Sequence, residues 1–204
     1  MKKLLVAAIA AAAVHATPAW AQSSPFNWTG FYVGAEGGGG WGMVGVNGIP
    51  NDAKVSGYLG GVQAGANWQN GNSVVGVAAD FNLSHLHGSV NWGGDIYSAT
   101  VRSFGTVEGR LGFVPTPGSQ LYASAGFAFG EVRGELETFK DKKWMNGWTV
   151  GFGYEWMING ATSLFVQYKH VDFGTKIFVL DDPEEVHVRF DVVKAGVNMR
   201  FGSR

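Results

Sequence analysis

The segments that connect the apolar, alternating runs of this chain are long and short in turn. The short connections contain turn residues, as in Asn70-Gly71-Asn72, in 115–119 and in 157–162. The long connections are predicted over residues 43–56, 85–96, 131–145 and 171–186. Seven connections predict eight strands, with long loops at one end of the sheet and short turns at the other. We therefore expect an all-β fold, an eight-stranded antiparallel transmembrane β-barrel with short periplasmic turns and four long outer loops.

The first residues have the features of an export signal. A charged start at Lys2-Lys3 precedes an apolar run over 4–14, and Ala19-Trp20-Ala21 has the small-x-small pattern of a cleavage site. The apolar run is too short to cross a bilayer as a helix. We predict a cleaved signal peptide over 1–21, one outer-membrane β-barrel domain over 22–204, and location in the cell outer membrane.

The composition argues against several classes of function. The chain has no cysteine, so a disulfide framework, a thiolate metal site and a cysteine nucleophile are excluded. Its formal net charge is −1 and no basic stripe is present, so nucleic acid is not an expected partner. The 32 glycines fall largely inside the alternating runs, where a tightly curved barrel needs close backbone approach.

Sorting each run by parity gives one uncharged apolar face and one polar face. A soluble barrel would turn the apolar face inward, whereas a membrane barrel does the reverse. The polar face is rich in small residues and its charges nearly balance, which suits a crowded lumen in which buried charges must be paired. We expect these charges to form a lumen network of Glu36, Asp80, Arg102, Glu108, Arg110, Glu155, Lys169, Lys194 and Arg200.

Aromatic side chains lie near both ends of the apolar face. Two aromatic girdles that flank an apolar band are typical of a barrel at the two lipid–water interfaces. The predicted girdle residues are Phe31, Trp41, Trp68, Phe113, Phe129, Trp148, Trp156 and Phe201. The alternative is a β-sandwich or a lipocalin-like cup with an aromatic core.

Three local motifs have residue types that can carry chemistry. Gly37-x-Gly39-x-x-Gly42 matches the dinucleotide fingerprint by letters, but no helix pattern follows, so a glycine-rich strand is favoured. Ser84 and His85 would suit a hydrolase, but adjacent strand residues point to opposite faces. We therefore predict that the protein is not an enzyme. His85 and His87 would share a face of a continued strand, a geometry suited to metal or haem, although we expect no cofactor.

Four segments carry a family resemblance. They are Trp28-Thr29-Gly30-Phe31-Tyr32-Val33-Gly34 and the residues 121–130, 147–151 and 194–201. In this order, after a signal peptide, the chain resembles the small alphaproteobacterial outer-membrane β-barrels, also called porin-family or outer-membrane immunogenic proteins, which are related in fold to the OmpA membrane domain. The resemblance implies an eight-stranded barrel inserted by the barrel-assembly machinery.

The expected function is structural and interfacial. We expect a monomer with its lumen plugged by ion pairs, which stabilises the envelope and presents its loops as a surface antigen or adhesin. The expected partners are outer-membrane lipids, lipopolysaccharide, the barrel-assembly machinery and a host or extracellular ligand at the loops. The alternatives are a small porin-type diffusion channel, a lipid-modifying hydrolase, and a haem-binding or metal-binding surface protein.

Overall fold

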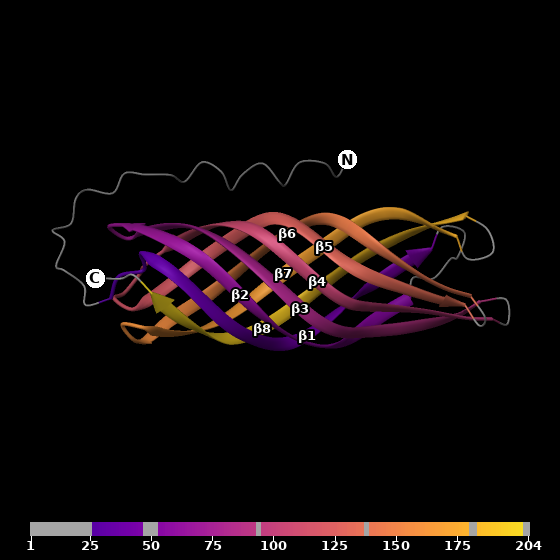
Figure 1. Ribbon diagram of the computed structural model, residues 1–204, viewed down its shortest axis with the longest axis horizontal. Helices are drawn as coiled ribbons and strands as arrows, with labels where there is room; N and C mark the ends of the chain where they lie inside the picture. Colours follow the sequence, from indigo (N-terminus) through magenta and orange to yellow (C-terminus); the bar gives the residue numbers. More distant parts are fainter. Residues whose placement is uncertain (1–25, 47–52, 93–94, 137–138, 180–182, 202–204) are drawn as a thin grey trace, which may run out of the picture.

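The protein is a closed, eight-stranded antiparallel β-barrel, as predicted (Figure 1). A computed structural model describes residues 26–46, 53–92, 95–136, 139–179 and 183–201; the predicted signal peptide lies outside these residues. The strands are β1 Gly30–Val46, β2 Ala53–Asn70, β3 Ser73–Trp92, β4 Asp95–Phe113, β5 Ser119–Leu136, β6 Phe139–Asn159, β7 Thr162–Val179 and β8 Pro183–Phe201. Across these residues no helix is both long and apolar enough to cross a bilayer.

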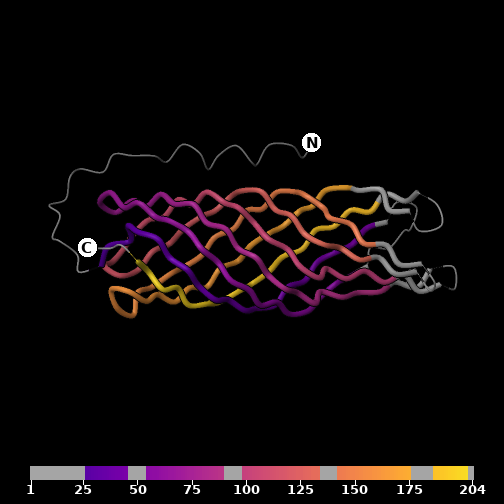
Figure 2. The backbone as a smooth tube through the Cα atoms, viewed as in Figure 1, coloured from indigo at the N-terminus to yellow at the C-terminus, as the bar shows by residue number. Residues whose placement is uncertain are grey.

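The sheet closes between its first and last strands. β1 pairs with β8 from Phe31 opposite Phe201 to Val46 opposite Val186, and every other strand pairs with its neighbours in sequence. The strands wind obliquely around the barrel axis, and the described chain begins and ends at the same end (Figure 2). Because a closed barrel has no free edge, its backbone hydrogen bonds are made between strands, as a lipid environment requires.

The short turns lie where the sequence predicts them. Asn70 pairs with Ser73 across a two-residue turn, in which Gly71 has φ of 60°. Glycine adopts this left-handed conformation without steric cost, which favours a tight hairpin. At the β4–β5 turn, Gly118 has φ of 82° and the Ser119 amide donates to the Thr116 carbonyl at 3.0 Å. We call this the short-turn end of the barrel.

The long connections are mostly paired strand rather than loop. The segment 85–96 is the clearest case, because β3 continues to Trp92 and pairs there with Asp95 at the start of β4. The other three long connections also contain strand on both sides, and their tips at 47–52, 137–138 and 180–182 lie outside the described residues. The sequence loses its outward apolar residues along these segments, which suggested loops. We call this the hairpin end.

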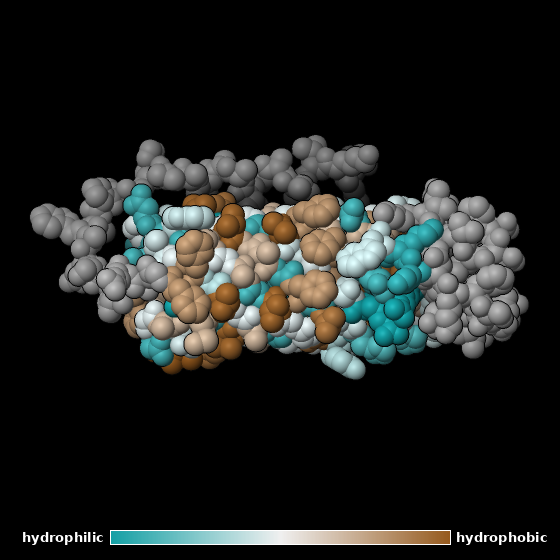
Figure 3. Space-filling model, viewed as in Figure 1, coloured by the Kyte–Doolittle hydropathy of each residue, from teal (hydrophilic) through white to brown (hydrophobic). Residues whose placement is uncertain are grey.

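The outer wall carries an apolar band that ends before the hairpin tips. Figure 3 shows apolar residues over the short-turn half and the middle of the barrel, with a polar belt nearer the hairpin end. The predicted outward parity is confirmed except around Val101 of β4, which is buried; Phe31, Leu83 and Leu111, for example, are each at least 67% exposed. All eight predicted girdle residues lie on this outer wall, six of them exposed and two, Phe129 and Trp156, half-buried.

Candidate functional site

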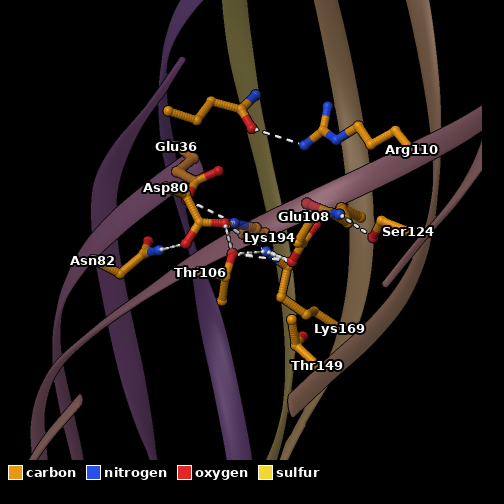
Figure 4. Close-up of polar contacts among 12 residues, drawn as sticks. Glu36, Asp80, Asn82, Thr106, Glu108, Arg110, Ser124, Thr149, Lys169 and Lys194 are labelled. Atoms are coloured by element: carbon orange, nitrogen blue, oxygen red, sulfur yellow. Dashed lines mark hydrogen bonds and ion pairs between the residues drawn. The ribbon is translucent and has the colours of Figure 1, made fainter. Parts of the chain in front are cut away.

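The middle of the barrel interior holds an ion-pair cluster built from five strands, β1, β3, β4, β7 and β8 (Figure 4). The Lys169 ammonium lies 2.5 Å from a carboxylate oxygen of Asp80 and 2.5 Å from one of Glu108. The Lys194 ammonium lies 2.7 Å from Glu36 and 3.0 Å from the same Asp80 oxygen. All five side chains are almost fully buried, so each charge depends on these partners for the stabilisation that water would otherwise supply.

Neutral side chains complete the coordination of the central carboxylates. The Thr106 hydroxyl lies 2.8 Å from Asp80 and 3.0 Å from Glu108, and it accepts a hydrogen bond from Lys169 at 2.9 Å. The Asn82 amide donates to the second Asp80 oxygen at 3.1 Å. Asp80 therefore links both lysines and is the most highly coordinated carboxylate of the cluster.

A second polar layer surrounds Arg110, nearer the short turns. Its guanidinium donates to the Tyr32 hydroxyl at 2.8 Å and to the Gln63 carbonyl oxygen at 3.1 Å. It also lies over the Tyr122 ring, 4.8 Å from the ring centroid. We expected Arg110 to pair directly with a buried acid. Among the described residues it instead contacts neutral groups, the Tyr32 hydroxyl, the Gln63 side chain and the Tyr122 ring.

The third polar group links Glu155 and Arg200. Their closest charged atoms are 3.4 Å apart, and the same Glu155 oxygen accepts from Ser163 at 2.5 Å and from Asn198 at 2.8 Å. Arg200 also donates to the Trp28 carbonyl at 2.5 Å and lies 4.8 Å from the Trp28 ring centroid. The sequence placed both charges in the lumen, but it did not predict a role for Trp28.

Trp28 closes the short-turn end of the interior. It is fully buried and packs in a cluster with Val74, Val114 and Met157, with Phe26 against the same cluster. Its backbone amide donates to Gln69 at 2.8 Å, which fixes the segment before β1 across the end of the barrel. An aromatic residue just before the first strand was the only sequence signal for this cap.

Glycines make room for the inward aromatic rings. A side chain at Gly65 would overlap the ring and hydroxyl of Tyr32, and one at Gly153 would overlap the Tyr122 ring. Gly65 and Gly153 thus leave room for tyrosine rings that come from the neighbouring strands β1 and β5. This agrees with the prediction of a crowded interior.

The interior of the hairpin half is apolar, which the sequence analysis missed. Phe104 packs edge-on against Phe190 at 5.2 Å between ring centroids, and Phe173 packs edge-on against the same ring at 5.5 Å. The buried members of this apolar core are Val44, Val55, Leu59, Leu86, Val101, Phe104, Ala128, Val132, Met145, Val171, Phe173, Val186, Val188, Phe190 and Val192. Many of them lie in the segments predicted as loops; the apolar alternation of Val186, Val188, Phe190 and Val192 was the available signal.

Arg102 does not belong to the lumen network, contrary to prediction. It is exposed, while its neighbour Val101, which we expected on the outer wall, is 1% exposed and part of the apolar core. The β4–β5 register shifts between Val101 and Ser103, which marks a β-bulge. One extra residue reverses the parity of the strand, so a residue counted as inward lies outside. The other eight predicted network residues are buried.

The remaining candidate motifs do not assemble a catalytic site. Ser84 donates to the Val101 carbonyl at 2.9 Å, whereas His85 is exposed on the outer wall, so the two face apart as expected. The His85 and His87 rings stack at 6.1 Å, and His87 contacts the Thr100 hydroxyl at 3.0 Å. In the described ranges no three His, Cys, Asp or Glu residues converge on a metal position.

The glycine motif lies inside a strand. Gly37, Gly39 and Gly42 are all residues of β1, and each pairs with β2 on one side and β8 on the other. A dinucleotide site needs a helix N-terminus after the glycines. The glycine-rich strand predicted for this segment is confirmed.

A closed barrel with an apolar outer band and a charged interior defines an integral outer-membrane β-barrel protein. The chain matches the outer membrane protein beta-barrel domain over residues 4–201 and belongs to that family. It is 33% identical to the 31 kDa outer-membrane immunogenic protein of Brucella melitensis, with 95% of this chain and 93% of the relative covered. It is also 33% identical to the 22 kDa outer membrane protein of Rhizobium leguminosarum, with 89% and 83% covered. The family resemblance drawn from the sequence is confirmed.

Solved structures share the same architecture at low sequence identity. OprG from Pseudomonas aeruginosa superposes with a TM-score of 0.57 at 12% identity, over 88% of this chain and 99% of that one. Neisserial surface protein A superposes with a TM-score of 0.55 at 15% identity, over 85% and 98%. Both likenesses concern the fold alone.

Proposed function

We propose that the protein is a closed structural barrel that stabilises the outer membrane and presents its long hairpins to the surroundings, without conducting solutes. The observation that carries this proposal is the succession of layers along the interior. The Trp28 cap, the two polar groups, the lysine–carboxylate cluster and the apolar core follow one another along the axis. A barrel of eight strands has an interior that side chains can fill, so a plugged lumen needs no extra domain.

Each layer opposes diffusion for its own physical reason. An apolar core offers no hydrogen bonds to a hydrated ion, so an ion passing it would lose its solvation without replacement. The central cluster would have to break paired buried charges, such as Lys194 with Glu36, to admit a solute. The proposal thus disfavours the small diffusion channel, because both the apolar core and the ion-pair cluster would oppose the passage of a solute.

The surface role is proposed for the hairpin end. With the short turns in the periplasm, as is usual for outer-membrane barrels, the hairpins extend outside the cell. The name of the Brucella relative describes an immunogenic protein, which agrees with a surface that other molecules can reach. We propose that these hairpins contact a host or extracellular ligand and that the barrel acts as a monomer, is delivered by a cleaved signal peptide and is inserted by the barrel-assembly machinery.

We propose no enzymatic activity for this barrel. The relatives named above carry names that state location and immunogenicity rather than a reaction. Ser84 and His85 face apart, so a base within reach of the hydroxyl is lacking in that pair. Lipid A that keeps its composition when the protein is expressed would agree with this; altered lipid A, lost on Ser84→Ala, would contradict it.

Planar-bilayer recording tests the closed lumen. The refolded barrel should insert and remain electrically silent, while a general porin recorded in the same bilayers shows discrete steps. Insertion is checked separately by the different gel mobility of heated and unheated samples. Reproducible unitary steps from the heat-modifiable protein would refute the closed barrel and support the channel.

A second test separates envelope stabilisation from surface contact. A deletion strain should become more sensitive to detergent, and a gene with the β5–β6 hairpin shortened should restore detergent resistance but not binding to host cells. Full detergent resistance of the deletion strain would contradict the structural role. Undiminished binding by the shortened form would contradict the role of that hairpin.

A further inference from the structure

Three basic side chains gather on the outer wall of β4–β6. They are Arg102, Arg133 and Lys142, here called the cationic patch. Arg102 and Lys142 are exposed, and the Arg133 side chain is 38% exposed. Among the side chains that the structure describes, Glu131 is the one acid that pairs with the patch, 3.0 Å from Arg133. Three cations and one carboxylate give these four side chains a net charge of +2.

The patch contains a like-charge pair that the strands hold together. Arg133 and Lys142 are direct cross-strand partners of β5 and β6, and Thr100 of β4 is the partner of Arg133 on its other side. Side chains directly opposite each other on one face are neighbours, and like charges in this position destabilise a sheet. Among the described residues Arg102 and Lys142 form no ion pair that would relieve this repulsion. An anionic ligand would relieve it.

The third cation reaches the patch because of the β-bulge. Arg102 has the same parity as Thr106, Glu108 and Arg110, which all point into the barrel. The register shift between Val101 and Ser103 turns Arg102 to the outer wall instead. Bulges commonly re-aim a side chain in this way. Without the bulge, an unpaired arginine would lie in the interior and the patch would have two cations.

The patch lies at the level of an aromatic boundary. Trp144, directly opposite Glu131, is 53% exposed, and Phe129 stacks on it at 6.3 Å. Such outward aromatics mark the lipid–water interface of a barrel, so the patch lies just outside the hydrocarbon layer. In the outer leaflet this is the level of the phosphate groups of lipopolysaccharide.

We propose that the cationic patch binds the phosphate groups of lipopolysaccharide molecules packed against the β4–β6 wall. This inference rests on the proposed orientation, with hairpins outside the cell. Arginine binds phosphate through its planar fork of donors and lysine as a compact charge, so the patch supplies both modes of contact. A lipid source is favoured over a soluble anion because the patch faces sideways into the surrounding leaflet, directly beside Trp144 and Phe129.

The test compares thermal unfolding of the refolded barrel with and without lipopolysaccharide, scored by gel mobility. The variant is Arg102→Gln/Lys142→Gln, which leaves the Arg133–Glu131 pair intact. Without lipopolysaccharide it should unfold at the same temperature as the parent or higher, because the repulsion is relieved. With lipopolysaccharide it should be stabilised less, with an apparent affinity lower by about tenfold, the scale of losing two partly exposed charged contacts.

Control experiments distinguish a specific binding site from a general effect of removing positive charge. Lys54→Gln removes one exposed lysine from β2, outside the β4–β6 wall, and should respond to lipopolysaccharide like the parent. Dephosphorylated lipopolysaccharide should stabilise parent and variant equally, and inorganic phosphate should stabilise neither. The proposal is overturned if the double variant keeps the full effect of lipopolysaccharide, if Lys54→Gln loses as much, or if inorganic phosphate alone reproduces the effect. Bilayer silence of the double variant is expected in every case, so the closed-lumen proposal is judged independently.

Discussion

Replacing Lys169 with methionine tests whether the central cluster holds the barrel together. Methionine keeps most of the side-chain volume but removes the ammonium that contacts Asp80, Glu108 and the Thr106 hydroxyl. Asp80 keeps Lys194 as a partner, whereas Glu108 would lose its only charged contact within 4 Å among the described residues. Removing one member of a buried pair costs about 3–5 kcal/mol, and we expect Lys169→Met to lower the unfolding free energy by that amount.

A second substitution identifies the cause of the loss. In Lys169→Met/Glu108→Gln the uncompensated carboxylate is gone, so we expect about 2 kcal/mol of the stability to return. Both variants are unfolded in urea from lipid vesicles, with tryptophan fluorescence as the signal and the denaturant slope as a check on two-state behaviour. Lys54→Met, an exposed substitution of the same type, should change the stability by less than about 0.5 kcal/mol.

Two results would refute the reasoning. If Lys169→Met unfolds at the same urea concentration as the parent, the ion pairs do not contribute to stability. If the double variant is no more stable than Lys169→Met, lost packing rather than an unpaired charge causes the effect. If the single variant cannot be refolded, recovery of folded protein with Glu108→Gln added gives the same distinction.

Three further substitutions address the other layers of the interior. Phe104→Ala should lower the unfolding free energy by about 3–5 kcal/mol, measured by urea unfolding, because a fully buried ring against Phe190 is lost; a loss below about 1 kcal/mol would argue against a packed apolar core. Gly65→Val should abolish the heat-modifiable gel band because the new side chain would overlap the Tyr32 ring, and an unchanged band would contradict that packing. Trp28→Ala should destabilise the barrel by about 3–5 kcal/mol in thermal unfolding, and parental stability would show that the cap is dispensable.

The parity of the strands could be predicted because the two faces differ in chemistry. In β8, Val193, Val197 and Phe201 alternate with Lys194 and other inward residues, so one face was recognisable as uncharged. Period-two alternation carries this information without knowledge of the partner strand. Closure, strand number and the position of the short turns followed from the same pattern with the turn residues.

The bulge and the apolar core could not be read in the same way. Arg102 has the inward parity of Arg110, and a one-residue insertion in a strand leaves no mark in the local composition around Ser103. The hairpin segments resemble loops in sequence because their outward residues, such as His187 and Arg189, are polar, and this polarity obscures the alternation of the inward valines. The partners of Arg110 depend on rings from β1 and β5, which a single strand does not reveal.

The point along the barrel at which the wall leaves the hydrocarbon layer is marked by an exchange of apolar and polar residues within β8. In β8 the inward residues change from Lys194 to Val192 and Phe190, while the outward residues change from Val193 to Asp191 and Arg189. Parity is unbroken, so only the solvent on each side can explain the exchange. From Val193 toward the short-turn end the wall faces lipid and the charged side chains lie in the interior. From Val193 toward the hairpin end the wall faces water and the interior is an apolar core.

This reversal gives the hairpin half a source of stability that does not depend on lipid. Its apolar core buries Phe104, Phe173 and Phe190 away from water, as in a soluble barrel. The hairpins are therefore expected to keep their pairing beyond the bilayer, where loops without such a core would not. A paired extension of this kind holds the cationic patch and the outward histidines at fixed heights along the barrel axis, which suits a surface that contacts the leaflet on its side and other molecules at its tip.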